Sequence, residues 1–140
     1  MHILDTDTLT HLHEGHPRVV QHLQKLNDPD VCITVITRIE LLRGRHDYLL
    51  KAATGPELVK AQQLLVRTES LLGLLRILPF DQGASIRFDQ LRLTKGLRKI
   101  GRADLLIASI TLAHRATLVT RNVRHFRVIP ELRVANWVDS

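Results

Sequence analysis

The sequence predicts a single α/β domain, a three-layer α/β/α sandwich around a mostly parallel sheet of four to five strands. Two observations predict this class. Short runs of β-branched and other apolar residues alternate along the chain with longer segments in which apolar residues recur at helical spacing. The length of 140 residues suits one compact domain, and no Pro-, Gly- or Ser-rich linker divides residues 1–140. Strands that alternate with helices form a parallel sheet covered on both faces.

The clearest predicted strand covers residues 31–36. This segment is β-branched almost throughout and therefore suits a strand buried on both faces of a sheet. The other apolar runs are shorter. They predict strands over residues 2–4, 75–78 and 117–120, and a short fifth strand over residues 132–135.

Helical segments separate these strands. In residues 57–72, apolar side chains recur at helical spacing, for example at Leu58, Ala61 and Leu65. Residues 45–56 have weak periodicity, several charges and a Gly-Pro pair, and predict a loop or a frayed helix. The remaining predicted helices are residues 8–13, 17–26, 37–43, 82–95 and 103–115.

The composition narrows the possible functions. Lys and Arg outnumber Asp and Glu by 20 to 14, and the net charge of +6 favours a polyanionic partner such as nucleic acid. Aromatic residues make up only 4% and are scattered, so contacts to phosphate are expected rather than base stacking. The single cysteine, Cys32, excludes an internal disulfide and a thiolate-rich metal site. With no membrane-spanning run and no secretory signal, a cytoplasmic protein is expected.

Four polar residues fall at the predicted carboxyl ends of strands or beside them. Asp5 ends the first strand, and Glu40 lies in the first turn after the second. Asp104 opens the helix before the fourth strand, and Asn122 lies just past that strand. Ligands of open parallel sheets bind beyond the carboxyl ends of the strands, so these side chains are expected at one edge.

Three carboxylates at one edge repel one another. At a separation of about 4 Å and an effective dielectric constant near 20, each pair costs on the order of 4 kcal/mol. A divalent cation relieves this repulsion, and oxygen ligands suit Mg²⁺ or Mn²⁺ rather than zinc. An acidic metal pocket in a basic protein is suited to phosphate chemistry on nucleic acid.

Taken alone, most of these acids also have a purely structural explanation. Glu40 completes a capping-box pattern that begins at Thr37. Asp104 suits a helix cap or a partner of the helix dipole, and Asp7 is favoured as the N-cap of the helix over residues 8–13. Asp5 resists such an explanation, because an acid at the end of a strand without an adjacent base costs stability.

Histidines and a basic run complete the candidates. His11, His13 and His16 lack the spacing of a metal-binding helix and are expected to be exposed. His125 is close to Asn122 in the sequence, but a solvated position is favoured for it. The basic run over residues 95–102 is expected to be a solvated loop, although it is well placed to contact phosphates.

Short motifs in a fixed order resemble those of PIN-domain ribonucleases of the VapC toxin type, and the resemblance covers essentially the whole chain. The most informative are the Leu-Asp-Thr-Asp-Thr-Leu of residues 4–9 and the Ile-Thr-Val-Ile-Thr-Arg-Ile-Glu of residues 33–40. Further matches are residues 41–44, 77–81, 101–108, 117–122, 125–126 and 136–137.

The resemblance implies a PIN-like fold and an Mg²⁺- or Mn²⁺-dependent endoribonuclease, the toxin of a type II toxin–antitoxin pair, which hydrolyses RNA through a metal-activated water. It places Asp5, Glu40 and Asp104 in the metal and catalytic site. Asn122 stands where the family often has a fourth acid, and its amide can bind a cation or orient water without adding charge. This departure puts a tightly bound second metal in doubt.

The resemblance also implies partners. Such proteins form homodimers and are inhibited by a cognate antitoxin whose tail packs over the site. Arg43, Arg102 and Arg121 are weaker candidates for contacts to RNA phosphates.

Two alternatives remain open at this point. Asp5-Thr6-Asp7 after an apolar strand also resembles the nucleophile motif of haloacid-dehalogenase-type phosphotransferases. However, Leu9 stands where that motif requires Thr, and its paired late acids are missing. The second alternative is a catalytically inactive, basic RNA-binding PIN module, which Asn122 keeps open.

Overall fold

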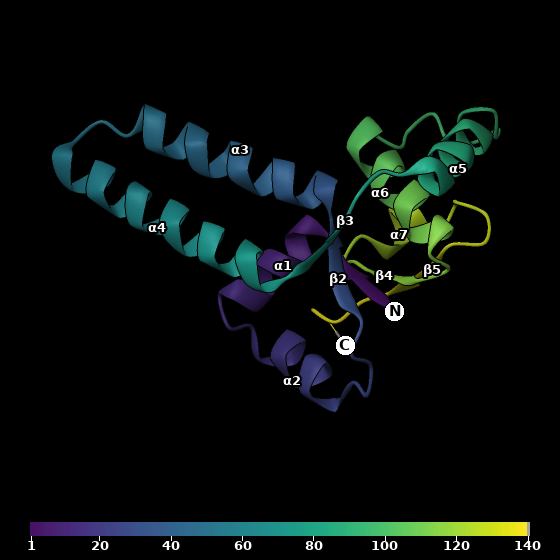
Figure 1. Ribbon diagram of the computed structural model, residues 1–140, viewed down its shortest axis with the longest axis horizontal. Helices are drawn as coiled ribbons and strands as arrows, with labels where there is room; N and C mark the ends of the chain where they lie inside the picture. The colour runs from purple at the N-terminus through teal and green to yellow at the C-terminus, as the bar shows by residue number, and fades with distance from the viewer. Residues whose placement is uncertain (140) are drawn as a thin grey trace.

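The computed structural model describes residues 1–139 and shows five parallel strands between two layers of helices (Figure 1). The sheet has the order β3-β2-β1-β4-β5, so β1 lies at its centre. The predicted fold class is therefore confirmed. The strands are β1 (His2–Leu4), β2 (Val31–Thr34), β3 (Arg76–Leu78), β4 (Thr117–Val119) and β5 (Arg133–Ala135).

Alternating side chains of the strands enter two separate hydrophobic cores. In β1, Ile3 packs into one core and Leu4 into the other, and in β4 Leu118 and Val119 divide in the same way. Helices α5 (Gln82–Arg92), α6 (Arg102–Ala113) and α7 (Val123–Phe126) cover the Ile3 face. The Leu4 face is covered by α1 (Thr6–His13), α2 (Pro17–Lys25), α3 (Val35–Lys51) and α4 (Gly55–Leu74). Each fully buried large side chain contributes roughly 1.5 to 3 kcal/mol.

The boundary between β2 and α3 differs from the predicted strand over residues 31–36. Thr34 is the N-cap of α3, and its hydroxyl oxygen accepts a hydrogen bond from the Thr37 backbone N–H at 3.3 Å. Val35 and Ile36 therefore begin the helix and pack against the Ile3 core in spite of their β-branched side chains. Apart from the end of α3, the other predicted boundaries agree to within a few residues.

Helices α3 and α4 form a long hairpin that projects beyond the sheet (Figure 1). Residues 45–56, predicted as a loop or a frayed helix, are mostly regular helix, because α3 continues to Lys51 and only residues 52–54 connect the two helices. Thr54 caps α4 by accepting a hydrogen bond from the Glu57 backbone N–H at 3.3 Å. The projecting part of the hairpin leaves apolar side chains exposed, among them Tyr48 and Leu50. Because these apolar side chains are exposed, residues 45–56 lack the regular alternation of apolar and polar positions that is typical of a helix with one buried face.

The free cysteine, Cys32, is fully buried in the Ile3 core. Within residues 1–139, no helix has both the length and the apolar content needed to cross a membrane.

Candidate functional site

A depression of about 220 Å³ lies at the carboxyl ends of the central strands. It contains Asp5, Glu40, Asp104 and Asn122, as the positions of these residues in the sequence predicted. They come from the end of β1, from α3, from the start of α6 and from the segment after β4. The other lining residues are Thr6, Asp7, Ile107 and Phe126.

Asp5 is the most buried acid of the depression, with 9% of its surface exposed. Its Oδ1 accepts a hydrogen bond from the Thr8 backbone N–H at 2.8 Å, which makes Asp5 the N-cap of α1. Burial raises the pKa of Asp5, although hydrogen bonds from Thr120 and Thr8 act in the opposite direction. The predicted capping role of Asp7 is wrong: Asp7 lies within the first turn of α1, exposed at the rim of the depression.

Glu40 connects α3 to α1. Its Oε1 accepts a hydrogen bond from the Thr6 hydroxyl at 2.6 Å, and the same hydroxyl lies 3.2 Å from that of Thr37. The capping box predicted for Thr37 and Glu40 does not form, because α3 begins earlier and Thr34 is its cap. Glu40 is thus held toward the depression by a residue directly after Asp5.

Asp104 lies in the first turn of α6, where the helix dipole favours a carboxylate. It is not the cap, because that position belongs to Gly101. The Asp104 Oδ2 lies 3.0 Å from His125 Nε2. His125 comes from α7 and is only 24% exposed, so the predicted solvated position is wrong and His125 orients Asp104.

Asn122 is exposed and precedes α7 without forming a side-chain capping bond. Its backbone N–H donates to the Thr120 hydroxyl at 3.0 Å, which fixes the turn after β4. The Asn122 amide is therefore not used to cap the helix and lines the depression instead.

The three predicted RNA-binding arginines lie outside the lining of the depression. Arg43 lines a separate groove along α3. Arg121 forms an exposed ion pair with Asp139 at 3.2 Å, and Arg102 lies over the ring of Phe88.

The residues of the depression suit a hard divalent cation by their chemistry. Among residues 1–139, no three His, Cys, Asp or Glu side chains are close enough to hold a metal ion as they stand. One oxygen of Glu40 is bound to Thr6, and one oxygen of Asp104 is bound to His125. However, carboxylate and amide oxygens are the ligands that Mg²⁺ and Mn²⁺ prefer. A cation would also offset the burial of the Asp5 carboxylate.

Sequence reasoning missed the two residues that hold the acids in place, Thr6 and His125. Thr6 stands between Asp5 and Asp7, but the sequence does not show that its hydroxyl meets Glu40. For His125 a signal was present, because it lies three residues after Asn122, within one helical turn.

Comparisons with known proteins agree with this geometry. Residues 2–132 match the family model of the PIN domain. Ribonuclease VapC2 of Rickettsia felis is 31% identical over 128 residues, which cover 79% of this chain and 95% of the relative. The tRNA(fMet)-specific endonuclease VapC of Salmonella typhimurium is 29% identical over 137 residues, 96% of each chain.

Solved structures show the same fold. FitAcB from Neisseria gonorrhoeae matches with a TM-score of 0.78 and 30% identity, covering 100% of both chains. VapBC2 from Rickettsia felis, bound to a DNA fragment from its promoter, matches with a TM-score of 0.76 and 28% identity, covering 97% of this chain and 98% of that chain. Because the family model spans most of the chain and VapC relatives align along it, this chain belongs to the PIN-domain family of VapC ribonucleases.

Proposed function

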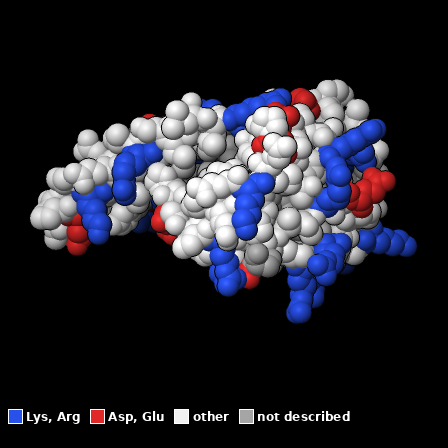
Figure 2. Space-filling view, turned by 90° about the horizontal axis from the view of Figure 1, so that it is seen from below, with Lys and Arg blue, Asp and Glu red and all other residues white. Residues whose placement is uncertain are grey.

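We propose that this PIN domain is the endoribonuclease toxin of a toxin–antitoxin pair and hydrolyses RNA at the acidic depression with Mg²⁺ or Mn²⁺. One observation carries the proposal: Asp5, Glu40, Asp104 and Asn122 come from separate segments and line one depression in a protein of net charge +6. Divalent-metal dependence is a general property of PIN-domain ribonucleases. Lys and Arg side chains lie on the right and lower parts of the face shown in Figure 2 with acids among them, and the net charge of +6 supports a polyanionic substrate.

The residues of the depression have different proposed roles. Asp5, Glu40 and Asp104 would hold the cation. When bound, it supplies positive charge that polarises the scissile phosphate and lowers the pKa of a water. Glu40, fixed by Thr6, orients the attacking water, while His125 holds one oxygen of Asp104 and leaves the other toward the depression.

Asn122 and the arginines act on the substrate side. The Asn122 amide oxygen adds a ligand, or orients water, without adding negative charge. Arg43, Arg102 and Arg121 contact phosphates of the RNA strand. Arg121 exchanges its exposed ion pair with Asp139 for a phosphate at little cost, because exposed pairs contribute only about 0 to 1 kcal/mol.

A cognate antitoxin is the proposed inhibitor, with its tail over the depression, and the active toxin is proposed to be a homodimer that works in the cytoplasm. Exposed apolar side chains on the α3–α4 hairpin, including Ile39, Val59 and Val66, support protein partners. Light scattering of the purified toxin checks the dimer, and a monomer at assay concentrations contradicts it.

The decisive experiment incubates the purified protein with total bacterial RNA in Mg²⁺, in Mn²⁺ and in EDTA. Initiator tRNA is a separate substrate, because the Salmonella relative is named for it. Asp5→Asn and Asp104→Asn variants control for contaminating nucleases. We expect discrete products that require metal and both carboxylates. Equal cleavage by Asp104→Asn would show that the site is assigned wrongly.

Asn122→Asp separates the nuclease from the remaining alternative, an inactive RNA-binding module. An added carboxylate is expected to increase cleavage at limiting Mg²⁺ by about tenfold, about 1.4 kcal/mol. RNA binding without cleavage by both wild type and Asn122→Asp would favour the inactive module. The family assignment already excludes the dehalogenase-type phosphotransferase.

A further inference from the structure

Two guanidinium groups lie over one aromatic ring near the acidic depression. The guanidinium carbons of Arg92 and Arg102 lie 5.7 and 5.5 Å from the centroid of the Phe88 ring. Phe80 packs edge-on against Phe88, with ring centroids 6.1 Å apart. We name these four residues the arginine–phenylalanine cluster. It joins the end of α5 to the start of α6, the helix that carries Asp104 in the same first turn as Arg102.

The cluster has an excess of positive charge. Arg92 pairs with Asp89 at 3.2 Å, whereas no carboxylate within residues 1–139 forms an ion pair with Arg102. The segment between Asp89 and Asp104 contains no acid at all. Its five cationic residues, all exposed, are Arg92, Lys95, Arg98, Lys99 and Arg102.

The segment between α5 and α6 is anchored in spite of its charge. Leu97 and Ile100 are each 8% exposed and pack into the core, so the chain cannot simply swing its cations apart into solvent. Two like charges beside one ring repel each other, and a single aspartate offsets only one of them. This arrangement is complementary to an anion with more than one charged group.

We propose that the arginine–phenylalanine cluster binds phosphates of the RNA strand beside the scissile bond. In this proposal Arg92 and Arg102 contact the phosphates, and Phe88 is a positioning residue that holds the guanidinium planes. A guanidinium group that lies over a ring keeps its N–H edges free for bidentate contact with phosphate oxygens. Arg102 and Asp104 both lie in the first turn of α6 but, two residues apart, point to different sides of the helix, so in this proposal the strand passes around the amino end of α6 from the cluster to the depression. The inference rests on the proposed ribonuclease function.

The test measures RNA affinity without cleavage. All variants are made in an Asp104→Asn background and titrated against a fluorescent single-stranded RNA and against tRNA, from about 50 to about 300 mM KCl. Arg102→Ala is expected to weaken binding about tenfold and to reduce the salt slope by about 0.7 to 1, the effect of one lost phosphate contact. Arg102→Lys is expected to keep the slope while losing part of the affinity.

Phe88→Leu tests whether the ring positions the two guanidinium groups, because it leaves their charge unchanged. It keeps both arginines and should weaken binding about threefold, consistent with the loss of an exposed cation–π contact, with an unchanged salt slope. The matched control is Arg76→Ala, an exposed arginine at the opposite end of the sheet strands, which should change neither quantity. Melting curves report folding, and if Phe88→Leu unfolds, Arg92→Ala and Arg102→Lys still decide the question.

The outcomes separate this inference from the proposed function. If Arg102→Ala binds RNA like Arg76→Ala, the cluster only fastens α5 to α6 and the inference is overturned. If wild type cleaves RNA in that case, the ribonuclease proposal stands without the cluster. If Arg102→Ala loses affinity and salt slope but wild type never cleaves, the phosphate-binding surface stands and the nuclease proposal fails.

Discussion

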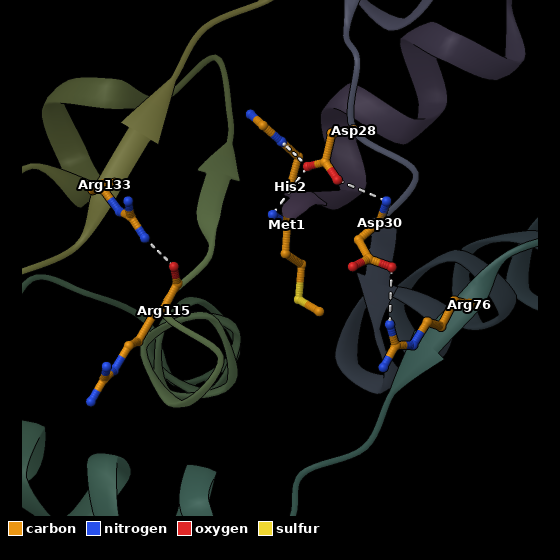
Figure 3. Close-up of polar contacts among 7 residues, drawn as sticks. All are labelled: Met1, His2, Asp28, Asp30, Arg76, Arg115 and Arg133. Carbon is orange, nitrogen blue, oxygen red and sulfur yellow. Dashed lines mark hydrogen bonds and ion pairs between the residues drawn. The ribbon is translucent and has the colours of Figure 1, made fainter.

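The two ends of the sheet strands use acidic side chains in opposite ways. At the carboxyl ends, Asp5 is buried in a depression with other acids around it, and its pKa is raised. At the amino ends, Asp28 lies beside two basic groups, with its Oδ2 3.0 Å from the Met1 ammonium and 2.6 Å from His2 Nδ1 (Figure 3). The His2 contact, with the Asp30 backbone N–H and the Met1 ammonium, lowers the pKa of Asp28 well below its usual range.

Other charged groups extend this paired arrangement. Asp30 pairs with Arg76 at 3.4 Å, and the Arg133 guanidinium donates to the Arg115 carbonyl (Figure 3). The same carboxylate chemistry therefore stabilises the fold where a cation lies beside it. In the depression, Asp5 forms hydrogen bonds but no ion pair within residues 1–139, so its burial leaves a site that a cation can stabilise.

The largest expected effect tests the carboxyl end. Asp5→Asn and Asp104→Asn should each reduce cleavage by at least about a thousandfold, about 4 kcal/mol of transition-state stabilisation. Asp5→Asn should not lower the melting temperature, because an amide in place of the carboxylate still offers an oxygen to Thr8 and the change removes a buried charge. Cleavage rates and thermal melts on the same preparations check both statements. If Asp5→Asn lowered the melting temperature as much as a core substitution does, Asp5 would serve stability as Asp28 does, and the two ends would not differ.

The next effect tests the amino end. Asp28→Asn should lower the melting temperature by several degrees and leave cleavage unchanged, because Asp28 stabilises the starts of β1 and β2 far from the depression. Asp47→Asn, at an exposed position on α3, is the control and should do neither. Cleavage that falls together with stability would show that the two ends are not independent.

The pH dependence of stability should have opposite signs at the two ends when metal is removed with EDTA. The lowered pKa of Asp28 gives stability that is present above about pH 3.9 and is lost as the pH falls through its folded-state value. The raised pKa of Asp5 gives stability that is present below about pH 3.9 and is lost as the pH rises through its folded-state value.

Urea unfolding between about pH 3 and pH 7 measures this difference. Asp28→Asn should flatten the increase in unfolding free energy with pH. Asp5→Asn should make that increase steeper and leave the protein more stable at neutral pH than wild type. If both variants shift the profile in the same direction, the contrast between the two ends is wrong.

The smallest expected effect is that of Arg76→Ala. Its ion pair with Asp30 is about half exposed on both sides, so its loss should change the unfolding free energy by no more than about 0.5 kcal/mol. A larger change would mean that the amino end acts as one connected network rather than as separate pairs.

The sequence predicted the sheet and the meeting of the four candidate residues because both follow from simple rules. Apolar runs locate the strands, and the rule for carboxyl ends of parallel strands brings Asp5, Glu40, Asp104 and Asn122 together. The sequence did not predict the start of α3, because one hydroxyl, that of Thr34, decides where the strand ends.

The remaining differences depend on contacts between distant segments. Asp5 rather than Asp7 caps α1, because burial at the end of β1 turns its carboxylate toward the helix. His125 meets Asp104 across 21 residues of sequence; its closeness to Asn122 indicated the site but not this partner. The α3–α4 hairpin continues through residues 45–51 although few of its side chains reach a core.

The central position of β1 affects the toxin while the ribosome is still making it. Residue 2 pairs with residue 117, so the middle of the sheet stays open until most of the polypeptide has been translated. Asn122, which lines the depression, and His125, which contacts Asp104, are added later still. A nascent or prematurely terminated chain therefore lacks the assembled acidic depression, so the proposed nuclease activity can arise only when synthesis is nearly finished.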